Sequence, residues 1–277
     1  MKKMISNLFK EIHASQKAKC KITNMPIGYP DLVYYTRSLV PGNVYVFCGA
    51  PRTLKTALLL QISHFMGCDF SYWVRFFSLF SSVESLIKRM LFAVSDISIL
   101  TFPYETPNYS TMQKLFMIGE RLRNSQFKFV CNSLLTLENI ENECKSKGDG
   151  KGVVVIDSFQ LFAYNKQKSS VLRKLKEIAV KWNIVILVAY DTNHNSIVNE
   201  HFLIKNGVDS IFLLKLEKFF GLDEGSGTLF FSILKQKDGP SADFILNYNK
   251  NSFKIYDDEN DIFDFSHSFA NERIPVC

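Results

Sequence analysis

One stretch decides the fold of this chain: Val44-Tyr45-Val46-Phe47-Cys48-Gly49-Ala50-Pro51-Arg52-Thr53-Leu54-Lys55-Thr56-Ala57-Leu58-Leu59-Leu60. An apolar run ends at Gly49, a short loop follows, and Lys55-Thr56 opens a second apolar run. This order predicts a buried strand, a phosphate-binding loop and a helix. The loop pattern is G-x-x-x-x-G-K-[ST], and the chain departs from it at the second glycine, where Leu54 stands.

The loop residues have distinct chemical tasks. Backbone N–H groups at a helix N-terminus form a cradle for phosphate, and we predict that Gly49 and Thr53 belong to it. Lys55 would reach the outer phosphates, and the Thr56 hydroxyl would bind Mg²⁺. The second glycine normally allows a backbone conformation that a side chain hinders, so Leu54 weakens the match. An ordinary strand-to-helix turn is the alternative interpretation.

Composition sets the class of protein. The 277 residues are 47% hydrophobic, which suffices for one large domain or two small ones. No apolar run approaches the roughly 18 residues of a membrane span, and the start lacks a signal-peptide pattern, so we expect a cytoplasmic protein. The six cysteines have no C-x-x-C spacing, which favours reduced core thiols over zinc or disulfides. A net charge of +6 permits nucleic-acid binding but does not establish it.

Strands alternate with helices along most of the chain. Continuously apolar central strands are typical of a parallel sheet covered on both faces, so we predict an α/β fold. The last strands lack intervening helices, which predicts an antiparallel addition at one edge, closed by a hairpin over 243–256. Residues 27–32 look like a turn. We expect strands at 44–48, 71–79, 127–131, 153–157, 184–190, 211–216 and 228–235, and helices at 56–66, 83–94, 111–124, 136–145 and 169–181.

A carboxylate follows the buried strand at 153–156. In phosphate-loop NTPases an Asp at the end of such a strand orients the hydration shell of Mg²⁺, which is the role we predict for Asp157. An Asp that caps the next turn is the alternative. Ligands of parallel sheets bind at the carboxyl ends of strands, where both motifs lie. The two motifs together therefore favour a nucleoside-triphosphate fold.

Further segments lie in the order and spacing of one known family. The stretch Val155-Ile156-Asp157-Ser158-Phe159-Gln160-Leu161 resembles V-I-D-Y-L-Q-L, and 49–56 resembles G-R-P-x-M-G-K-T. Other matches are 27–32 (T-G-F-x-x-L-D), 77–81 (F-S-L-E-M), 175–179 (L-K-E-L-A), Asp209 (the last Asp of D-A-D) and 235–240 (K-x-R-N-G-P). Together they resemble the C-terminal, RecA-like motor domain of DnaB-type replicative DNA helicases over residues 25–256.

The departures from this family fall on residues that carry its chemistry. The family's catalytic Glu, which activates the attacking water, is Phe80 here, and Phe cannot take a proton. The nucleotide-sensing Gln is Asp191. The arginine finger, donated across a subunit interface to the γ-phosphate, is Lys237, which keeps the charge but loses the planar fork. The family's DNA-contacting loop is also altered, with Asn199, Glu200 and Phe202 at the positions it uses.

The resemblance implies a RecA-like P-loop NTPase that uses ATP and Mg²⁺. It makes Asp157 and Lys237 the candidate catalytic residues and Lys235 a further nucleotide contact. Because the scaffold is kept while the chemistry changes, we expect a DnaB-like protein of DNA replication with weak or absent ATP hydrolysis. One alternative is an active ATPase that moves on single-stranded DNA, with its base relocated to Glu84 or Asp191. Another is a different RecA-like ATPase of recombination or regulation.

The two ends of the chain give expectations about assembly. Met4, Ile5, Leu8, Phe9 and Ile12 have the spacing of an amphipathic helix within 1–24, which packs either on its own domain or on a neighbouring subunit. This segment resembles the family's linker helix, which implies a hexamer or ring-like oligomer, or binding to a partner replication protein. We expect a loosely held tail at 257–277, and a member without the family's N-terminal domain or its usual primase contacts.

Overall fold

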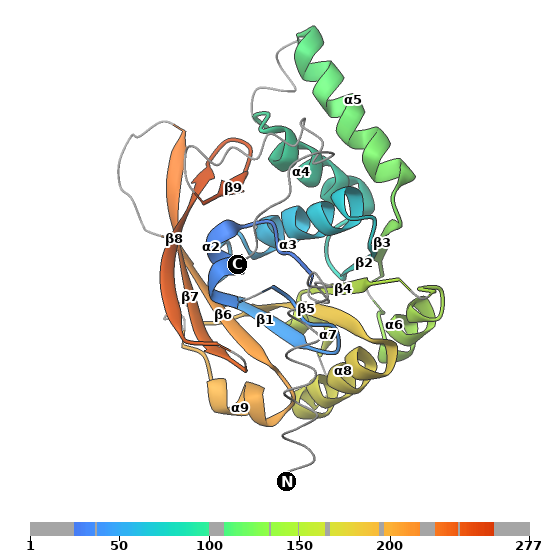
Figure 1. The fold of residues 1–277 in the computed structure, drawn as a ribbon, viewed down its shortest axis with the longest axis vertical. Helices are drawn as coiled ribbons and strands as arrows, with labels where there is room; N and C mark the ends of the chain where they lie inside the picture. Colours follow the sequence, from blue (N-terminus) through green and yellow to red (C-terminus); the bar gives the residue numbers. More distant parts are fainter. Residues whose placement is uncertain are drawn as a thin grey trace, which may run out of the picture.

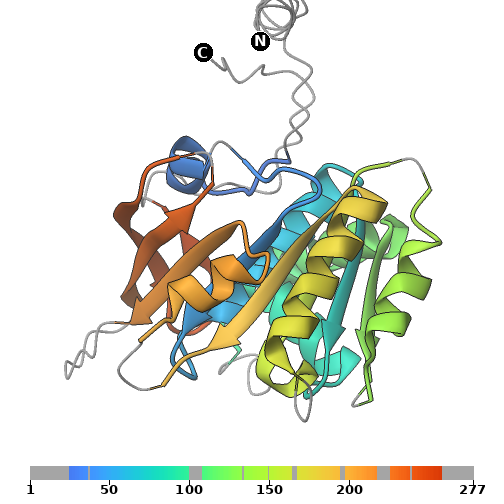
Figure 2. The ribbon, with the colours of Figure 1, turned by 90° about the horizontal axis from the view of Figure 1, so that it is seen from below.

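The computed structural model describes residues 25–36, 38–99, 108–132, 134–148, 150–163, 167–193, 197–216, 225–237 and 239–257. The N-terminal helix predicted within 1–24 and the tail beyond 257 lie outside these ranges. The described residues form one nine-stranded sheet in the order β3-β2-β4-β5-β1-β6-β7-β8-β9, with helices on both faces (Figures 1 and 2). None of the helices in the described ranges is long and apolar enough to cross a membrane.

The first six strands in this order are parallel, as predicted. Every residue of β1 is buried, and five of the six residues of β4 are buried, which is why these strands are apolar without alternation. The parallel strands are β3 (Phe127–Cys131), β2 (Trp73–Ser78), β4 (Gly152–Asp157), β5 (Ile184–Asp191), β1 (Val44–Gly49) and β6 (Ser210–Leu216).

The sheet separates two hydrophobic clusters. Successive side chains of β1 point to opposite faces, so Tyr45 and Phe47 belong to one cluster and Val44, Val46 and Cys48 to the other. The first cluster lies under α3 (Lys55–His64), α4 (Val83–Ser95) and α5 (Tyr109–Asn124). The second lies under α6 (Leu137–Cys144), α7 (Phe159–Phe162), α8 (Lys168–Trp182) and α9 (Glu200–Lys205). Figure 1 shows these two groups of helices on either side of the sheet.

Three antiparallel strands complete the sheet beyond β6: β7 (Ser226–Gln236), β8 (Ala242–Asn249) and β9 (Ile255–Tyr256). They confirm the predicted edge addition and its closing hairpin, and they stand at the end of the sheet farthest from β3 (Figure 2).

Some local predictions were wrong. The segment predicted as a turn at 27–32 enters helix α2 (Pro30–Thr36) at a proline, whose fixed φ and missing N–H are tolerated in the first helical turn. Helix α3 continues into a π-helical turn, η1 (Phe65–Asp69). The short helices α7 and α9 were not predicted, because four and six residues carry too little periodicity.

Two residues within family-like motifs hold the amino-terminal ends of the strands together. The ammonium of Lys176 on α8 donates to the carboxylate of Asp209 at 2.7 Å, to the carbonyl of Gly42 at 2.7 Å and to Oδ1 of Asn43 at 3.0 Å. The same carboxylate accepts a hydrogen bond from the backbone N–H of Val44 at 2.8 Å. This cluster ties α8 to the starts of β1 and β6, so these two matches have a structural task.

His64 gives the fold a pH dependence that can be measured. The side chain is 1% exposed, and burial, assisted by the charge of Arg121, lowers its pKa from 6.5 to about 4. As the pH falls through 6.5 the unfolded chain takes up this proton first. The free energy of unfolding should therefore drop between pH 6.5 and pH 4, by up to about 3 kcal/mol. Urea denaturation across this range should show a smaller drop for His64→Leu.

The matched control is His201→Leu, because His201 is exposed on α9. It should keep the wild-type pH dependence. A His64→Leu variant that loses as much stability on acidification as the wild type would contradict the assignment.

Candidate nucleotide site

The carboxyl ends of the parallel strands bring most of the predicted site residues to one edge of the sheet. In the register of the sheet, Gly49 at the end of β1 lies beside Asp191 at the end of β5. Asp157 ends β4 at the same edge, and α3 begins directly after the loop, at Lys55. This confirms the prediction that Lys55 and Asp157 share one edge, since Thr56, the next residue of α3, contacts Asp157.

The loop backbone adopts the conformation that the second motif glycine serves. Leu54 has φ 62° and ψ 12°, in the left-handed region, and Arg52 also has a positive φ of 67°. A side chain in this region costs about 1 to 2 kcal/mol, which a glycine avoids. The half-buried side chain of Leu54 packs against the first hydrophobic cluster. Leu54 therefore keeps the backbone shape of the motif and carries a local strain.

Gly49 is fixed by close packing. A Cβ at this position would lie 2.4 Å from Oγ1 of Thr53 and 2.8 Å from the carbonyl oxygen of Leu214. The Thr53 hydroxyl donates to the carbonyl of Ala50 at 2.8 Å and is 8% exposed. The loop thus folds tightly over the end of β1, and only glycine fits beneath it.

Thr56 and Asp157 supply a pair of oxygen ligands. The Thr56 hydroxyl donates to the Asp157 carboxylate, with distances of 3.0 and 3.2 Å to its two oxygens. Burial raises the pKa of Asp157, although the bond from Thr56 and the charge of Arg89 oppose the rise. Hydroxyl and carboxylate oxygens suit Mg²⁺, which usually takes one or two protein ligands together with substrate phosphates. No group of three or more His, Cys, Asp or Glu in the described ranges could hold a metal by itself, so phosphate would have to complete this site.

Lys55 makes all its contacts within the chain. It is 6% exposed, and its ammonium lies 2.9 Å from the carbonyl oxygen of Gly49 and 2.7 Å from that of Ala50. The Thr53 hydroxyl is 3.3 Å away, and Oδ1 of Asp191 is 3.1 Å away. The loop and the end of β5 therefore surround the charge that the motif offers to phosphate.

Gln160 fixes the end of β5 and was not predicted as a site residue. Its side-chain oxygen accepts from the backbone N–H of Asp191 at 2.9 Å, and its amide nitrogen donates to the carbonyl of the same residue. The signal was present in the sequence, because this glutamine belongs to the segment that resembles V-I-D-Y-L-Q-L.

The positions proposed for a catalytic base differ in their surroundings. Phe80 follows β2 at the carboxyl edge, is 88% exposed and has no group that takes a proton. Glu84 is largely exposed on α4, and its carboxylate pairs with Lys88 at 2.8 Å. Asp191, by contrast, contacts Lys55 directly. Of the two candidates for a relocated base, only Asp191 therefore touches the loop lysine.

Lys235 and Lys237 do not join the other predicted site residues. Strand β7 runs antiparallel to β6, and Lys235 pairs with Ile211 near the start of β6. Both lysines therefore lie toward the amino-terminal ends of the parallel strands, away from the edge that carries Lys55. The altered DNA-contacting positions begin α9, where Asn199 accepts a hydrogen bond from the backbone N–H of Phe202 at 2.9 Å. A hollow beside α9 is lined by Glu200, His201, Ile204, Lys205 and Lys235.

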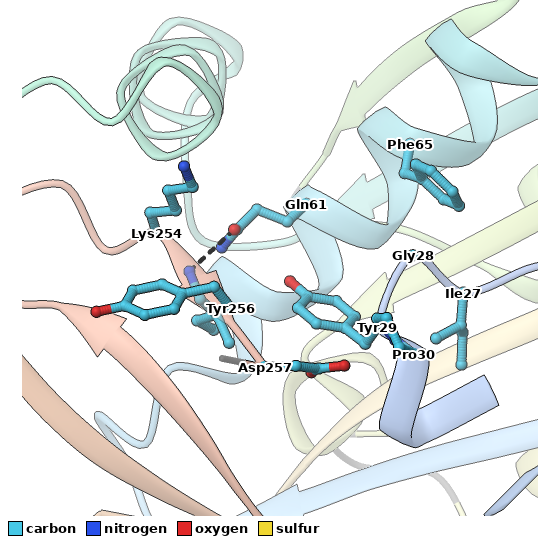
Figure 3. A pocket seen from close by; sticks show the side chains of 10 residues that line it. Ile27, Gly28, Tyr29, Pro30, Gln61, Phe65, Lys254, Tyr256 and Asp257 are labelled. Carbon is cyan, nitrogen blue, oxygen red and sulfur yellow. Dashed lines mark hydrogen bonds between the residues drawn. The ribbon is translucent and has the colours of Figure 1, made fainter. Parts of the chain in front are cut away.

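Another pocket lies between α2, α3 and β9 and contains none of the predicted site residues (Figure 3). Within it, Oε1 of Gln61 accepts from the backbone N–H of Ile255 at 3.0 Å. The Asp257 carboxylate accepts from the backbone N–H of Asp31 at 2.9 Å. Burial raises the pKa of Tyr29, which lines the same pocket. These contacts fasten the antiparallel edge to the helices.

The fold and the edge that carries this loop define an α/β, RecA-like ATPase-domain architecture. A solved structure of an isolated ATPase domain superposes with a TM-score of 0.79 at 19% identity, covering 93% of this chain and 98% of that one. "The Structure Of A DnaB-Like Replicative Helicase And Its Interactions With Primase" gives 0.78 at 18% identity, covering 92% and 66%. At these identities the likeness shows the fold.

The sequence comparison identifies the family. The profile of the DnaB-like helicase C terminal domain matches residues 24–257, and the chain belongs to that family. It is 23% identical over 276 residues to the replicative DNA helicase DnaC of Bacillus subtilis (strain 168), covering 90% of this chain and 61% of that protein. It is 24% identical over 256 residues to the replicative DNA helicase DnaB of Geobacillus stearothermophilus, covering 83% and 56%. The chain thus spans less than two thirds of these relatives.

The strain at Leu54 predicts an unusual order of stability. Leu54→Gly and Leu54→Ala lose nearly the same side-chain contacts, but only the Ala variant keeps a Cβ at positive φ. The Gly variant should therefore be more stable than the Ala variant by about 1 kcal/mol in urea denaturation. At Lys114, exposed within α5, the order should reverse because Ala favours a helix by about 1 kcal/mol. An Ala variant at position 54 that matches or exceeds the Gly variant would contradict the strain.

Proposed function

We propose that this chain is a DnaB-like helicase-domain protein of DNA replication that binds Mg²⁺-ATP weakly and hydrolyses it slowly or not at all. The observation that carries the proposal is the contrast at one sheet edge. Gly49, Lys55, Thr56 and Asp157 lie together there, while the exposed Phe80 stands where the family has its catalytic Glu.

The residues at this edge have the chemistry to hold a nucleotide. The loop backbone around Gly49 and Thr53 would contact the phosphates, and Lys55 would offer its charge to the outer ones. Thr56 and Asp157 would hold Mg²⁺, which when bound neutralises phosphate charge. In this arrangement Asp157 acts through its hydrogen bond with Thr56.

The missing groups account for weak hydrolysis. General-base catalysis typically contributes about a hundred- to ten-thousand-fold, and Phe80 cannot supply it. An arginine finger contributes about a thousand- to a hundred-thousand-fold, of which Lys237 keeps the charge without the bidentate geometry. These losses need not multiply, because groups that act as a unit are not additive.

The positions of Lys235 and Lys237 support assembly from several copies. They lie away from the edge that carries Lys55. A contact between either lysine and a nucleotide held by Lys55 would therefore come from a second copy. This favours the hexamer or ring-like oligomer that the resemblance implies, with residues 1–24 as the segment that packs on a neighbour. Single-stranded DNA and a partner replication protein are the ligands that such a particle would bind.

A second candidate function rests on Asp191. Its carboxylate lies 3.1 Å from the ammonium of Lys55, so a base at this position would be inside the site. The chain would then be an active ATPase that moves on single-stranded DNA, with its base relocated.

ATP hydrolysis with and without single-stranded DNA separates these two functions. We expect slow turnover by the unmodified chain, and an increase of about tenfold or more on Phe80→Glu with Leu54→Gly, because these changes restore the base and the glycine. Leu134→Glu with Leu54→Gly is the matched control, since Leu134 is another apolar residue, 80% exposed, that follows a strand at the same edge. Helicase-like rates in the unmodified chain that are lost on Glu84→Gln or Asp191→Asn would overturn the proposal.

Light scattering tests the assembly. At high protein concentration the full chain should form a particle larger than a monomer, because residues 1–20 would pack on a neighbouring copy. Deletion of these residues should reduce the mass, whereas deletion of 258–277 should leave it unchanged. A monomeric mass at high concentration, unaltered by the first deletion, would count against self-association through this segment.

A further inference from the structure

We propose that Asp191 is an internal competitor of phosphate. Its carboxylate holds the charge of Lys55, and a nucleotide must displace it in order to bind. The proposal rests on the nucleotide-binding function above and adds the residue that sets the affinity of the site. The family places a neutral glutamine at this position, so the competing charge belongs to this chain.

The contacts of Lys55 carry the first step. An ammonium group has three protons, and four oxygens of the chain lie within 3.3 Å of this one. Two are backbone carbonyls of the loop and one is a hydroxyl, so Asp191 is the charged member of the set. With only 6% of Lys55 exposed, a phosphate can reach the ammonium only by replacing one or more of these oxygens.

The second step is that the backbone carrying Asp191 is fixed. Its own N–H and carbonyl are held by Gln160, and the next N–H, of Thr192, donates to the carbonyl of Gly49 at 2.9 Å. The strand register also sets it beside Gly49. A carboxylate anchored on both sides remains next to the loop when the side chain of Lys55 moves.

The third step is the charge that an incoming phosphate meets. Asp157 contacts Thr56, Asp191 contacts Lys55, and both carboxylates lie at the edge where the phosphates would bind. Near a protein surface, unit charges about 4 Å apart interact strongly enough to change a binding constant by tenfold or more. Asp191 therefore acts twice, by occupying the lysine and by repelling the ligand.

Binding of Mg²⁺-ATP to the full chain tests the proposal by titration calorimetry. Asp191→Asn removes the charge and keeps the shape, and Asp191→Gln introduces the family's residue. Both should lower the Kd by about tenfold or more. Asp243→Asn is the charge-matched control, because Asp243 is exposed on β8 in the antiparallel edge, and its Kd should equal that of the wild type.

Thermal unfolding supplies a second readout that does not depend on turnover. Without ligand, Asp191→Asn should unfold at a lower temperature than the wild type, because Lys55 loses its charged partner. Saturating Mg²⁺-ATP should then raise its Tm more than it raises that of the wild type.

The outcomes separate the two proposals. If the wild type binds Mg²⁺-ATP and both Asp191 variants bind it equally well or more weakly, the competitor role is overturned and the nucleotide function stands. If neither the wild type nor the variants bind, the nucleotide function fails and the competitor role fails with it. Tighter binding by the Asp191 variants, with the Asp243 control unchanged, supports both.

Discussion

The close packing under Gly49 is the contact on which the candidate site depends. Because this residue has no Cβ, the loop folds back onto the end of β1, with Thr53 and the carbonyl of Leu214 directly against it. That fold starts α3 above the ends of the parallel strands and places Lys55 against the end of β5. A methyl group at Gly49 would push the loop away from the sheet and separate these groups.

Several motif-like residues in this chain serve the scaffold. Lys176 and Asp209 join α8 to the starts of two strands, and Gln160 holds the end of β5. None of these contacts requires a nucleotide, so the fold can persist after the catalytic positions change. The exposed Phe80 illustrates the other side, because a residue with 88% of its surface exposed contributes little to packing and can change at small cost to stability.

The direction of β7 divides the candidate chemistry between two edges of the molecule. An antiparallel strand beside β6 carries its last residues back toward the start of β6, so Lys235 and Lys237 cannot share the edge of the loop. Had β7 been parallel, its end would have met the phosphate loop. The topology thus makes any joint action of Lys55 and Lys237 an intermolecular one.

The sequence by itself determined the parallel core, the loop and the edge that Lys55 shares with Asp157, because continuous apolar strands and a strand-loop-helix pattern are local features. It did not determine α2, α7 and α9, whose short lengths leave weak periodicity. Only the tertiary structure decided which residues meet across the sheet. The pairing of Lys55 with Asp191 and the separation of Lys237 from the loop depend on strand order and register, which join segments more than a hundred residues apart.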